Sequence, residues 1–562
     1  MVLSKLMTKQ NRRFLTGTPR RRTNLNIPSI SLMWPGKVPN ASPTSASWES
    51  DLGLDDLIQT LALDRTYQAF IRKTLAALII DTDVIAWRQA VTADFINNPK
   101  LVTQAQLILP RLTHMRQGTS LLGTRQRNLL LDTADHLAEL DSYVSIVQQL
   151  HDGLVDSTLE SRALIQLRDH LAILLADEDF QALQRDLPEL RAPLENIRSL
   201  TIGINLDVEL RPYSATLMAI NDQLVGEPNS ILNRLLGMRT DETDDVGIAP
   251  LHYTPRDPNQ RPLSPLFQDL DRILTQVAQP VAKALSRYVK VGSTNLANLE
   301  NELAFYVGSS RLFLNLAERG MPFCRPEIAP IQETVTAIRD LTNIVLCIKA
   351  KESPIPSDAD FDENGQIAIL TGPNNGGKTT YLRSVGLAQV MFQAGLFISA
   401  RAARMSPVDK IATHFPVAES RQEGRLAEEA TRLHGLFQQI TANSLVLLNE
   451  TFSSTSSDEA FYLARDIICG LRVVGVRAIY ATHLTQLAEN LPEIEARVEG
   501  HSKLFSLVAG IQLTDNGQVA PTFQITRGLP LGRSYAQEIA RHHGISLEQI
   551  LQARSNGTAK DT

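Results

Sequence analysis

A glycine-rich stretch at residues 366–384 constrains the fold of this chain more than any other part of it. The stretch holds a complete G-x-x-x-x-G-K-[ST] pattern, made of Gly372, Gly377, Lys378 and Thr379. The apolar run Ile367–Leu370 before it predicts a buried strand, and a helix is expected from about Lys378. This strand, turn and helix disfavour the alternative of a chance glycine-rich turn. We therefore expect the stretch to bind a nucleoside triphosphate.

The residue types in this turn suit phosphate chemistry. The glycines allow backbone N–H groups to close round phosphates, and the N-terminus of the next helix faces the anion. Lys378 can reach the β- and γ-phosphates, and the Thr379 hydroxyl can ligate Mg²⁺. ATP and Mg²⁺ are thus the expected cofactors. We predict nucleotide contacts from the whole loop: Gly372, Pro373, Asn374, Asn375, Gly376, Gly377, Lys378, Thr379 and Thr380.

The composition is that of a soluble globular protein. The 562 residues are 43% hydrophobic and 21% charged, which fits roughly three or four domains. No apolar run approaches the roughly 20 residues that cross a bilayer, so we expect no membrane partner. The three cysteines, Cys324, Cys347 and Cys469, lack metal-ligand spacing and are expected to be core residues in a reducing compartment. A cytoplasmic location follows from these features.

The net charge of −6 hides an asymmetry between the amino-terminal segment and the rest. Residues 1–50 contain eight Lys and Arg against a single Glu, a net charge of +7, so the remainder carries −13. Residues 1–48 contain no acidic residue and show no sustained periodicity, so we predict a basic disordered arm. Three interpretations stay open: a solvated tail, an arm that contacts phosphates, and an organelle transit segment.

A long helical region follows the arm. Apolar residues recur at helical spacing in the set Leu130, Ala134, Leu137, Leu140, Val144 and Val147, and 264–350 continues the pattern. Between these parts, strict alternation from Leu200 to Leu210 predicts a strand, and Ala215–Ile220 can return as a second strand. We interpret 198–262 as a β-hairpin insertion with an irregular loop. Its net charge of −3 does not favour contact with DNA.

The composition changes to α/β after about residue 350. Strand candidates Ile367–Leu370, Leu445–Leu448 and Val476–Ala481 alternate with helices, which predicts a mostly parallel sheet with helices on both faces. The second strand is followed by Asn449 and Glu450, at the edge where ligands bind such sheets. There Glu450 is a candidate to polarise the water that attacks the γ-phosphate.

Two further residues near these strand ends are candidates for the same site. Asn449 stands where an Asp usually helps to hold Mg²⁺; its amide oxygen can accept from a metal-bound water but brings no charge. We therefore expect weaker Mg²⁺ affinity and slow hydrolysis. His483 follows the next strand and can bond the γ-phosphate or the attacking water, although a lone histidine is more often structural. We assign catalytic roles to Glu450 and His483, and metal ligation to Thr379 and Asn449.

Residues 371–483 resemble the ATPase domain of the MutS family of DNA mismatch-repair proteins, in the ABC-type branch of P-loop ATPases. Residues 371–383 read T-G-P-N-N-G-G-K-T-T-Y-L-R and are similar to the family's TGPNMGGKST-Y-[LM]-R. Residues 444–450 are similar to its SLVLMDE. Residues 424–429 match a shortened form of its ST-F-M-V-E-M stretch, with Glu429 at the carboxylate.

The same resemblance implies a homodimer. Residues 454–456 fall on the G-T-S of the family's signature loop, which completes the neighbouring subunit's ATP site, so Ser456 would act in trans. The tail from Arg533 to Arg554 is similar to the family's K-S-Y-G…A-G-[VI]-P…A-R ending, which contributes to dimerisation.

The resemblance extends more weakly back to about Leu54, where paired helices split by an insertion look like the family's lever domain. It implies three domains: the arm at 1–48, a helical lever domain at 49–352 with the insertion at 198–262, and an ATPase domain at 353–562 that ends in dimerisation helices. Asn449 replaces the family's Asp, and Phe452-Ser453-Ser454 replaces its Gly-Arg-Gly. Nothing resembles the mismatch-reading domain or its Phe-x-Glu wedge, so a short form without that domain is expected.

Two functions of different classes follow from these patterns. The first is a MutS-like DNA-binding ATPase, in which ATP binding and hydrolysis in a dimer drive lever movement on DNA during repair or recombination. The second is an ATP-dependent protein-interaction switch with slow or no hydrolysis and no mismatch recognition. The first is the leading hypothesis; the missing mismatch-reading domain, the acidic insertion and Asn449 favour the second as its alternative.

Overall fold

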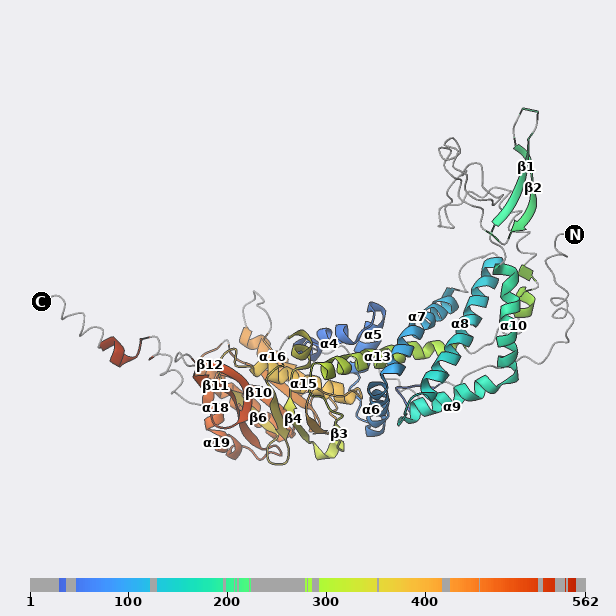
Figure 1. Cartoon of the computed structure of the whole chain (residues 1–562). Helices are drawn as coiled ribbons and strands as arrows, with labels where there is room; N and C mark the ends of the chain where they lie inside the picture. The colour runs from blue at the N-terminus through green and yellow to red at the C-terminus, as the bar shows by residue number, and fades with distance from the viewer. Residues whose placement is uncertain are drawn as a thin grey trace. The chain divides into compact units, whose positions relative to one another are not determined.

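A computed structural model gives the fold (Figure 1). It describes residues 30–36, 47–121, 129–195, 199–206, 208–209, 212–221, 223, 278–279, 281–285, 293–350, 353–416, 425–453, 455–513, 519–530, 541 and 544–551. Most of the predicted arm, the irregular loop of the insertion and most of the predicted dimerisation segment lie outside these residues. The described helices include none long and apolar enough to cross a membrane. The chain divides into two compact units, and each is described by itself.

The first unit takes in residues 1–30, 107–153 and 167–300. It contains helix α10 (Glu178–Glu195), nearly all of α8 (Leu129–Val155), and parts of α7 (Pro99–Leu121), α9 (Arg162–Ala176) and α13 (Ser293–Glu318). The predicted apolar stripe of α8 is buried at Leu137, Leu140, Val144 and Val147. Tyr143 of α8 meets Phe180 of α10 edge to face, with ring centroids 6.1 Å apart. The helical periodicity of the sequence thus marks the buried face of α8.

A buried carboxylate and a β-hairpin complete this unit. Glu300 is fully buried and accepts hydrogen bonds from Thr113 Oγ1 at 2.7 Å and Arg116 Nε at 2.6 Å. Strands β1 (Ser199–Leu206) and β2 (Pro212–Asn221) pair antiparallel, where the alternation of the sequence predicts two strands.

The second unit takes in residues 31–106, 154–166 and 301–562 and contains two sheets. The larger sheet has the order β12-β11-β6-β10-β9-β8. Its strands are β6 (Ile367–Thr371), β8 (Ile411–His414), β9 (Leu445–Asn449), β10 (Arg477–Ala481), β11 (Leu504–Leu513) and β12 (Val519–Arg527). All neighbours pair in parallel except β11 and β12. The sequence prediction of a helical region followed by an α/β domain is confirmed at this level.

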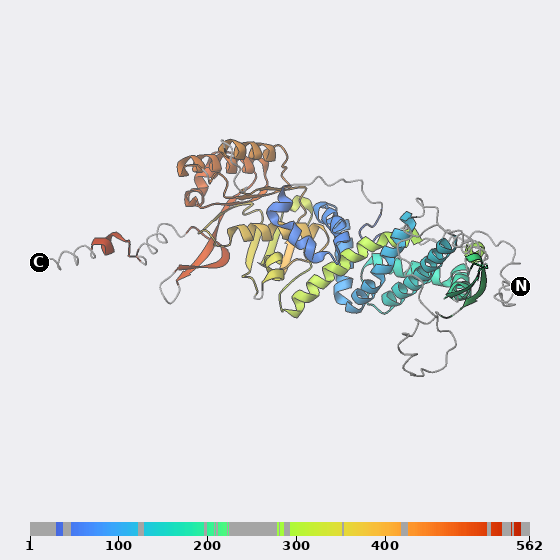
Figure 2. The same ribbon diagram turned by 90° about the horizontal axis from the view of Figure 1, so that it is seen from above.

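The strands of this sheet are fully buried where the sequence is apolar, as in β6, β9 and β10. Helices α16 (Arg425–Phe437), α17 (Ser457–Val474), α18 (Thr485–Glu489) and α19 (Leu491–Ala496) share one hydrophobic core with these strands. Helix α15 (Lys378–Gln393) packs on β9 and β10. Figure 2 shows the orange helices of the first group and α15 on opposite sides of the sheet.

The smaller sheet has the order β3-β7-β4-β5. Its strands are β3 (Glu327–Ile328), β4 (Thr336–Leu341), β5 (Ser357–Phe361) and β7 (Ala402–Met405), accompanied by helix α14 (Ile344–Lys349) and turn η4 (Ile331–Glu333). Arg477, at the start of β10, joins the two sheets: its guanidinium donates to Thr336 Oγ1 at 2.7 Å and to the Pro407 carbonyl at 3.2 Å. Burial lowers the pKa of Arg477 to about 10. The Arg477 guanidinium thus links the larger sheet to Thr336 in β4 of the smaller sheet and to the segment after β7.

Helices from the amino-terminal part of the chain pack in the second unit too. These are α3 (Trp48–Leu52), α4 (Leu54–Leu61), η1 (Arg65–Tyr67), α5 (Gln68–Ala76) and α6 (Thr82–Asn97). Leu52 packs so close to Gly386 of α15 that a Cβ there would lie 2.6 Å from its Cδ2. Arg383 Nε donates to the Asp51 carbonyl at 2.8 Å. The division into units therefore does not follow the predicted boundary at 352/353, because apolar faces far apart in sequence meet here.

Part of the predicted arm is anchored in this unit. Ser31 Oγ and the Leu32 amide donate to the Glu302 carboxylate at 2.7 and 2.6 Å. Arg88 Nε donates to the Met33 carbonyl at 3.0 Å, and its guanidinium lies 4.4 Å from the ring centre of Trp34. Residues 31–34 thus differ from the expected disorder, because their apolar side chains and backbone groups find buried partners.

Candidate nucleotide-binding site

The loop between β6 and α15 needs glycine at two positions. Gly372 has a φ of +141°, and a Cβ atom there would lie 2.6 Å from the Cβ of Ala509 in β11. Gly377, at the N-cap of α15, has a φ of +93°. Residues with a side chain rarely adopt such angles. The predicted turn therefore leaves the carboxyl end of β6 and leads directly into the N-terminus of α15.

The remaining loop residues form the tip of this turn. Asn374 and Asn375 are exposed, and Asn375 has a φ of +61°. The Gly376 amide donates to the Pro373 carbonyl at 3.1 Å. Thr380 belongs to the first turn of α15 and is half-buried. The exposed residues Asn374 and Asn375 thus lie between Gly372, which packs against Ala509, and the N-terminus of α15.

Lys378 is the first residue of α15, and its side chain is only 4% exposed. Its Nζ donates to the carbonyl oxygens of Gly372 at 2.9 Å and Pro373 at 3.0 Å. The Glu450 Oε1 atom lies 3.9 Å from the same Nζ. Burial lowers the pKa of Lys378, and the negative charge of Glu450 opposes this shift. Since an ammonium group has three donors, one remains beyond the two carbonyls.

Thr379 lies in α15, which follows β6, and Asn449 ends β9; the two residues meet at the carboxyl edge of the larger sheet. The Thr379 Oγ1 atom donates to the Asn449 Oδ1 atom at 3.2 Å. Asn449 is the last residue of β9 and is 6% exposed. Both predicted metal ligands are therefore present together, as a neutral hydroxyl–amide pair.

Glu450 follows β9 in a left-handed backbone conformation, with a φ of +49°. Its amide donates to the Ala481 carbonyl of β10 at 2.8 Å. Its side chain is about one-third exposed at 32% and faces the Lys378 ammonium. The turn after β9 thus brings the Glu450 carboxylate close to Lys378, which begins the helix after β6.

The other predicted catalytic residue, His483, follows β10 and is exposed. The preceding residue, Thr482, is buried, and its hydroxyl accepts from the Leu484 amide at 3.0 Å. His483 therefore belongs to the same sheet edge. Among the described residues, the site side chains Lys378, Thr379, Asn449 and Glu450 make no hydrogen bond or ion pair with its ring.

Ser456 caps the N-terminus of α17. It accepts a hydrogen bond from the Glu459 amide at 3.4 Å, and its hydroxyl donates to the Glu459 carboxylate at 2.9 Å. Thr455 donates to the same carboxylate. These bonds, that from Thr455 first, lower the pKa of Glu459. Ser456 thus serves α17 within its own chain.

The sequence analysis missed one residue beside this edge and gave another no role. His414, the last residue of β8, lies with its Nδ1 atom 3.2 Å from Thr451 Oγ1. Glu429 of α16 accepts from the Phe452 amide at 2.9 Å. A signal existed for the histidine, because Thr413-His414 closes its strand as Thr482-His483 closes another.

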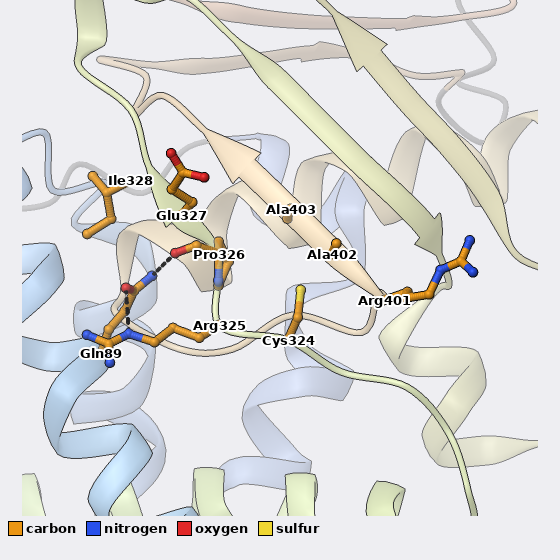
Figure 3. A pocket seen from close by; sticks show the side chains of 9 residues that line it. All are labelled: Gln89, Cys324, Arg325, Pro326, Glu327, Ile328, Arg401, Ala402 and Ala403. Carbon is orange, nitrogen blue, oxygen red and sulfur yellow. Dashed lines mark hydrogen bonds between the residues drawn. The ribbon is translucent and has the colours of Figure 1, made fainter.

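A cavity of about 500 Å³ lies elsewhere in the second unit (Figure 3). Its walls come from α6, β3, β7 and the segments beside them: Gln89, Cys324, Arg325, Pro326, Glu327, Ile328, Arg401, Ala402 and Ala403. Figure 3 shows Arg325 and Arg401 extending in opposite directions, so their charges do not converge on one ligand. The predicted loop residues do not line this cavity.

The residues at the sheet edge fit a triphosphate and a hard cation. A helix N-terminus and a buried lysine with a spare donor suit phosphate oxygens. A hydroxyl and an amide oxygen suit Mg²⁺, which prefers oxygen ligands and retains several waters. The side chains of Lys378, Thr379 and Asn449 would thus hold these groups.

Two family models match the sequence. The one described as MutS2 N-terminal domain matches residues 80–319, and the one described as MutS domain V matches residues 368–559. The second match contains the six-stranded sheet and the candidate site. The fold and the site therefore define an α/β protein of the class of MutS domain V, preceded by a helical region.

Similar curated proteins carry the same family names. An Endonuclease MutS2 of Thermus thermophilus is 33% identical over 35% of this chain and 25% of its own length. Another Endonuclease MutS2, of Thermomicrobium roseum, is 30% identical over 50% of this chain and 34% of its own length. A DNA mismatch repair protein MutS of Prochlorococcus marinus is 22% identical over 88% of this chain and 56% of its own length.

The chain belongs to the MutS family. It spans between a quarter and just over half of the length of these relatives.

Proposed function

We propose that this chain is an ATPase that binds ATP with Mg²⁺ in the loop 372–380 and hydrolyses it. The observation that carries the proposal is the approach of Glu450 Oε1 to Lys378 Nζ, at 3.9 Å. Lys378 follows β6 and Glu450 follows β9, two strands that both flank β10. Transfer of a phosphoryl group to water needs a cation that binds the phosphates and a carboxylate that orients the water, and both lie at this edge of the sheet.

The proposed roles follow from the chemistry of each group. Lys378 neutralises charge on the β- and γ-phosphates, while Gly372–Gly377 amides and the α15 N-terminus surround them. Glu450 accepts a proton of the attacking water and orients it, and His483 bonds the γ-phosphate or that water. Thr379 and, through water, Asn449 hold the Mg²⁺ ion, which supplies charge neutralisation between the phosphates when bound.

We further propose that two copies of the chain act together. Ser456 and the N-terminus of α17 of one copy would complete the site of the other, with dimerisation through the carboxyl-terminal segment. ATP would then favour one dimer geometry, because an effector shifts an equilibrium only by its different affinity for the two states. The helical region at 49–352 would carry that change to DNA in repair or recombination; one relative is named as a DNA mismatch repair protein.

Nucleotide assays on matched variants test the proposal. Lys378→Ala should abolish ATP binding, since it removes the buried cation of the loop. Glu450→Gln should retain binding and lower turnover about 100-fold or more, a range typical for loss of a catalytic base. Lys503→Ala and Glu489→Gln, which change exposed side chains of the same unit, should match the wild type. Unchanged turnover in both site variants would refute the assignment.

One observation favours a second candidate, the ATP-dependent protein-interaction switch with slow or no hydrolysis. Asn449 is neutral, and its amide oxygen already accepts from Thr379. A DNA panel of plain, mismatched and branched duplexes, measured over a salt series with each nucleotide, separates the two functions. Phosphate contacts predict affinity that falls steeply with salt. Absence of DNA binding at low salt would favour the switch.

A further inference from the structure

The turn at residues 450–452 has a backbone that its sequence does not favour. Glu450 has a φ of +49° and Phe452 has a φ of +63°, although neither residue is glycine. A residue with a large side chain adopts such angles at a cost in free energy, and the conformation persists only where its surroundings impose it. The turn therefore depends on its neighbours for its shape.

Three elements supply hydrogen bonds to this turn. From β10, the Ala481 carbonyl accepts from the Glu450 amide at 2.8 Å, and the Tyr480 hydroxyl donates to the Thr451 carbonyl at 3.3 Å. From β8, His414 Nδ1 pairs with Thr451 Oγ1 at 3.2 Å. From α16, the Glu429 carboxylate accepts from the Phe452 amide at 2.9 Å. Successive residues of the turn are thus fixed from different sides.

Packing fixes the turn as well. The Phe452 side chain is 2% exposed and belongs to the core shared with Val446, Leu448 and Ala460. Burial of a large aromatic ring offsets part of the backbone strain. Phe452 stands where the resemblance places a glycine, so this chain holds by side-chain contacts a turn that glycine adopts without them.

His414 is a buried histidine at the end of β8. It is 3% exposed, and its Nε2 atom is buried without a hydrogen-bond partner among the described residues. A buried polar atom without a partner is unfavourable, so an apolar residue would pack there at lower cost. Among the described side chains, the hydrogen-bond partner of this ring is Thr451, the residue that follows Glu450.

We propose that His414 and Glu429 are positioning residues of the ATPase site, which hold the 450–452 turn so that the Glu450 carboxylate faces Lys378. The inference rests on the proposed ATPase function. His414 fixes the hydroxyl of Thr451, which lies between the two strained residues, and Glu429 fixes the amide of Phe452, the second of them. Both act through Glu450, and neither contacts the nucleotide.

Single substitutions provide the first test. His414→Ala, Glu429→Ala and Thr451→Val each remove one bond to the turn. They should lower kcat roughly 10- to 100-fold, as expected when a catalytic group is displaced by about 1 Å. The dissociation constant for ATP should stay within about twofold, because Lys378 and the loop are unaltered. Thr451→Ser and Glu429→Gln, which keep the hydroxyl and the carbonyl oxygen, should recover most of the loss. His434→Ala and Glu489→Ala are exposed controls.

A double-substitution cycle separates positioning from a general loss of structure. In a Glu450→Gln background, His414→Ala and Thr451→Val should cause no further loss of turnover, because their effect passes through the missing carboxylate. An equal further loss in that background would overturn the inference, as would unchanged kcat in the single variants. If His414→Ala does not fold, Thr451→Val carries the same test. A wild type without turnover would instead refute the proposed function, and this inference with it.

Discussion

The hydroxyl of Thr379 donates a hydrogen bond of 3.2 Å to the amide oxygen of Asn449, a residue 70 positions further along the chain. The bond joins the helix that follows β6 to the end of β9. Asn449 is buried at 6% exposure, so its amide is not simply a solvated surface group. Because both partners are neutral, the proposed Mg²⁺ ligands bring less negative charge to this edge of the sheet than an Asp would provide.

Restoring that charge should strengthen magnesium binding. In the Asn449→Asp variant, we expect the Mg²⁺ concentration for half-maximal nucleotide binding to fall about tenfold, which corresponds to about 1.4 kcal/mol. A magnesium titration monitored with a fluorescent ATP analogue measures this shift. Asn443→Asp, at a half-buried position in the turn before β9, is the matched control. An equal magnesium requirement in all three proteins would contradict the assignment of Asn449.

Closing the space at Gly372 should damage both the fold and the loop. In Gly372→Ala, the added Cβ would lie 2.6 Å from Ala509 Cβ at a φ of +141°, so we expect a loss of about 2–4 kcal/mol of stability and of ATP affinity. Gly435→Ala is the contrasting control, because α16 leaves open space there. It should stabilise the protein by about 0.5–1 kcal/mol. Urea denaturation and ATP binding would show the difference; equal effects would refute it.

Much of the candidate site could be predicted from local sequence. The apolar run before Gly372 marks β6, the loop pattern marks the start of α15, and Asn449 and Glu450 directly follow an apolar strand. Each of these signals lies within about ten residues, where periodicity and turn chemistry decide the structure. The order of the strands then places the signals at one edge.

Other features depend on contacts between distant segments. The packing of Leu52 against Gly386 and the anchoring of residues 31–34 join parts of the chain about 270 to 330 positions apart, as the bonds to Glu302 and Arg383 do. Local periodicity carries no information on such pairs. His414 is a similar case, because a lone histidine at a strand end gains meaning only when β8 is known to neighbour β9. The backbone strain at Phe452 likewise cannot be predicted from the sequence, because it is recognised only from the backbone angles.

Acid should destabilise the protein through His414. Burial, with a smaller effect of the Arg432 charge on α16, lowers the pKa of His414 to about 4, and among the described side chains its hydrogen-bond partner is the neutral Thr451 hydroxyl. Between pH 6.5 and 4, the unfolded chain binds a proton at this ring and the folded chain does not. The stability present above pH 6.5 is therefore lost as the pH falls through this window, by about 2 kcal/mol at pH 5.

The variant His414→Asn isolates this contribution. It cannot titrate, so its free energy of unfolding should decline about 2 kcal/mol less than that of the wild type between pH 7.5 and pH 5. Urea denaturation at a series of pH values measures both curves. The variant His483→Asn, which changes an exposed ring, should follow the wild type. Parallel curves for wild type and His414→Asn would refute the buried, neutral state of the ring.

Truncations within the amino-terminal segment should separate its anchored part from the rest. Removing residues 1–29 leaves the bonds of Ser31, Leu32 and Met33 in place, so stability should change little. Removing residues 1–36 strips both the buried Arg88 guanidinium and the Glu302 carboxylate of partners. Burial raises the pKa of Glu302 and lowers that of Arg88, and the bonds from residues 31–33 oppose the shift of Glu302. We expect the longer deletion to cost about 3–5 kcal/mol.

Thermal and urea unfolding of the two truncated proteins measure this difference, and DNA binding at low salt can be compared in the same pair. If the basic residues before position 30 contact phosphates, the shorter deletion should already reduce DNA affinity and the slope of its salt dependence. Its effect would then appear without loss of stability, because the anchor remains. Equal stability of the two truncated proteins would show that residues 31–34 do not hold Arg88 and Glu302 in solution.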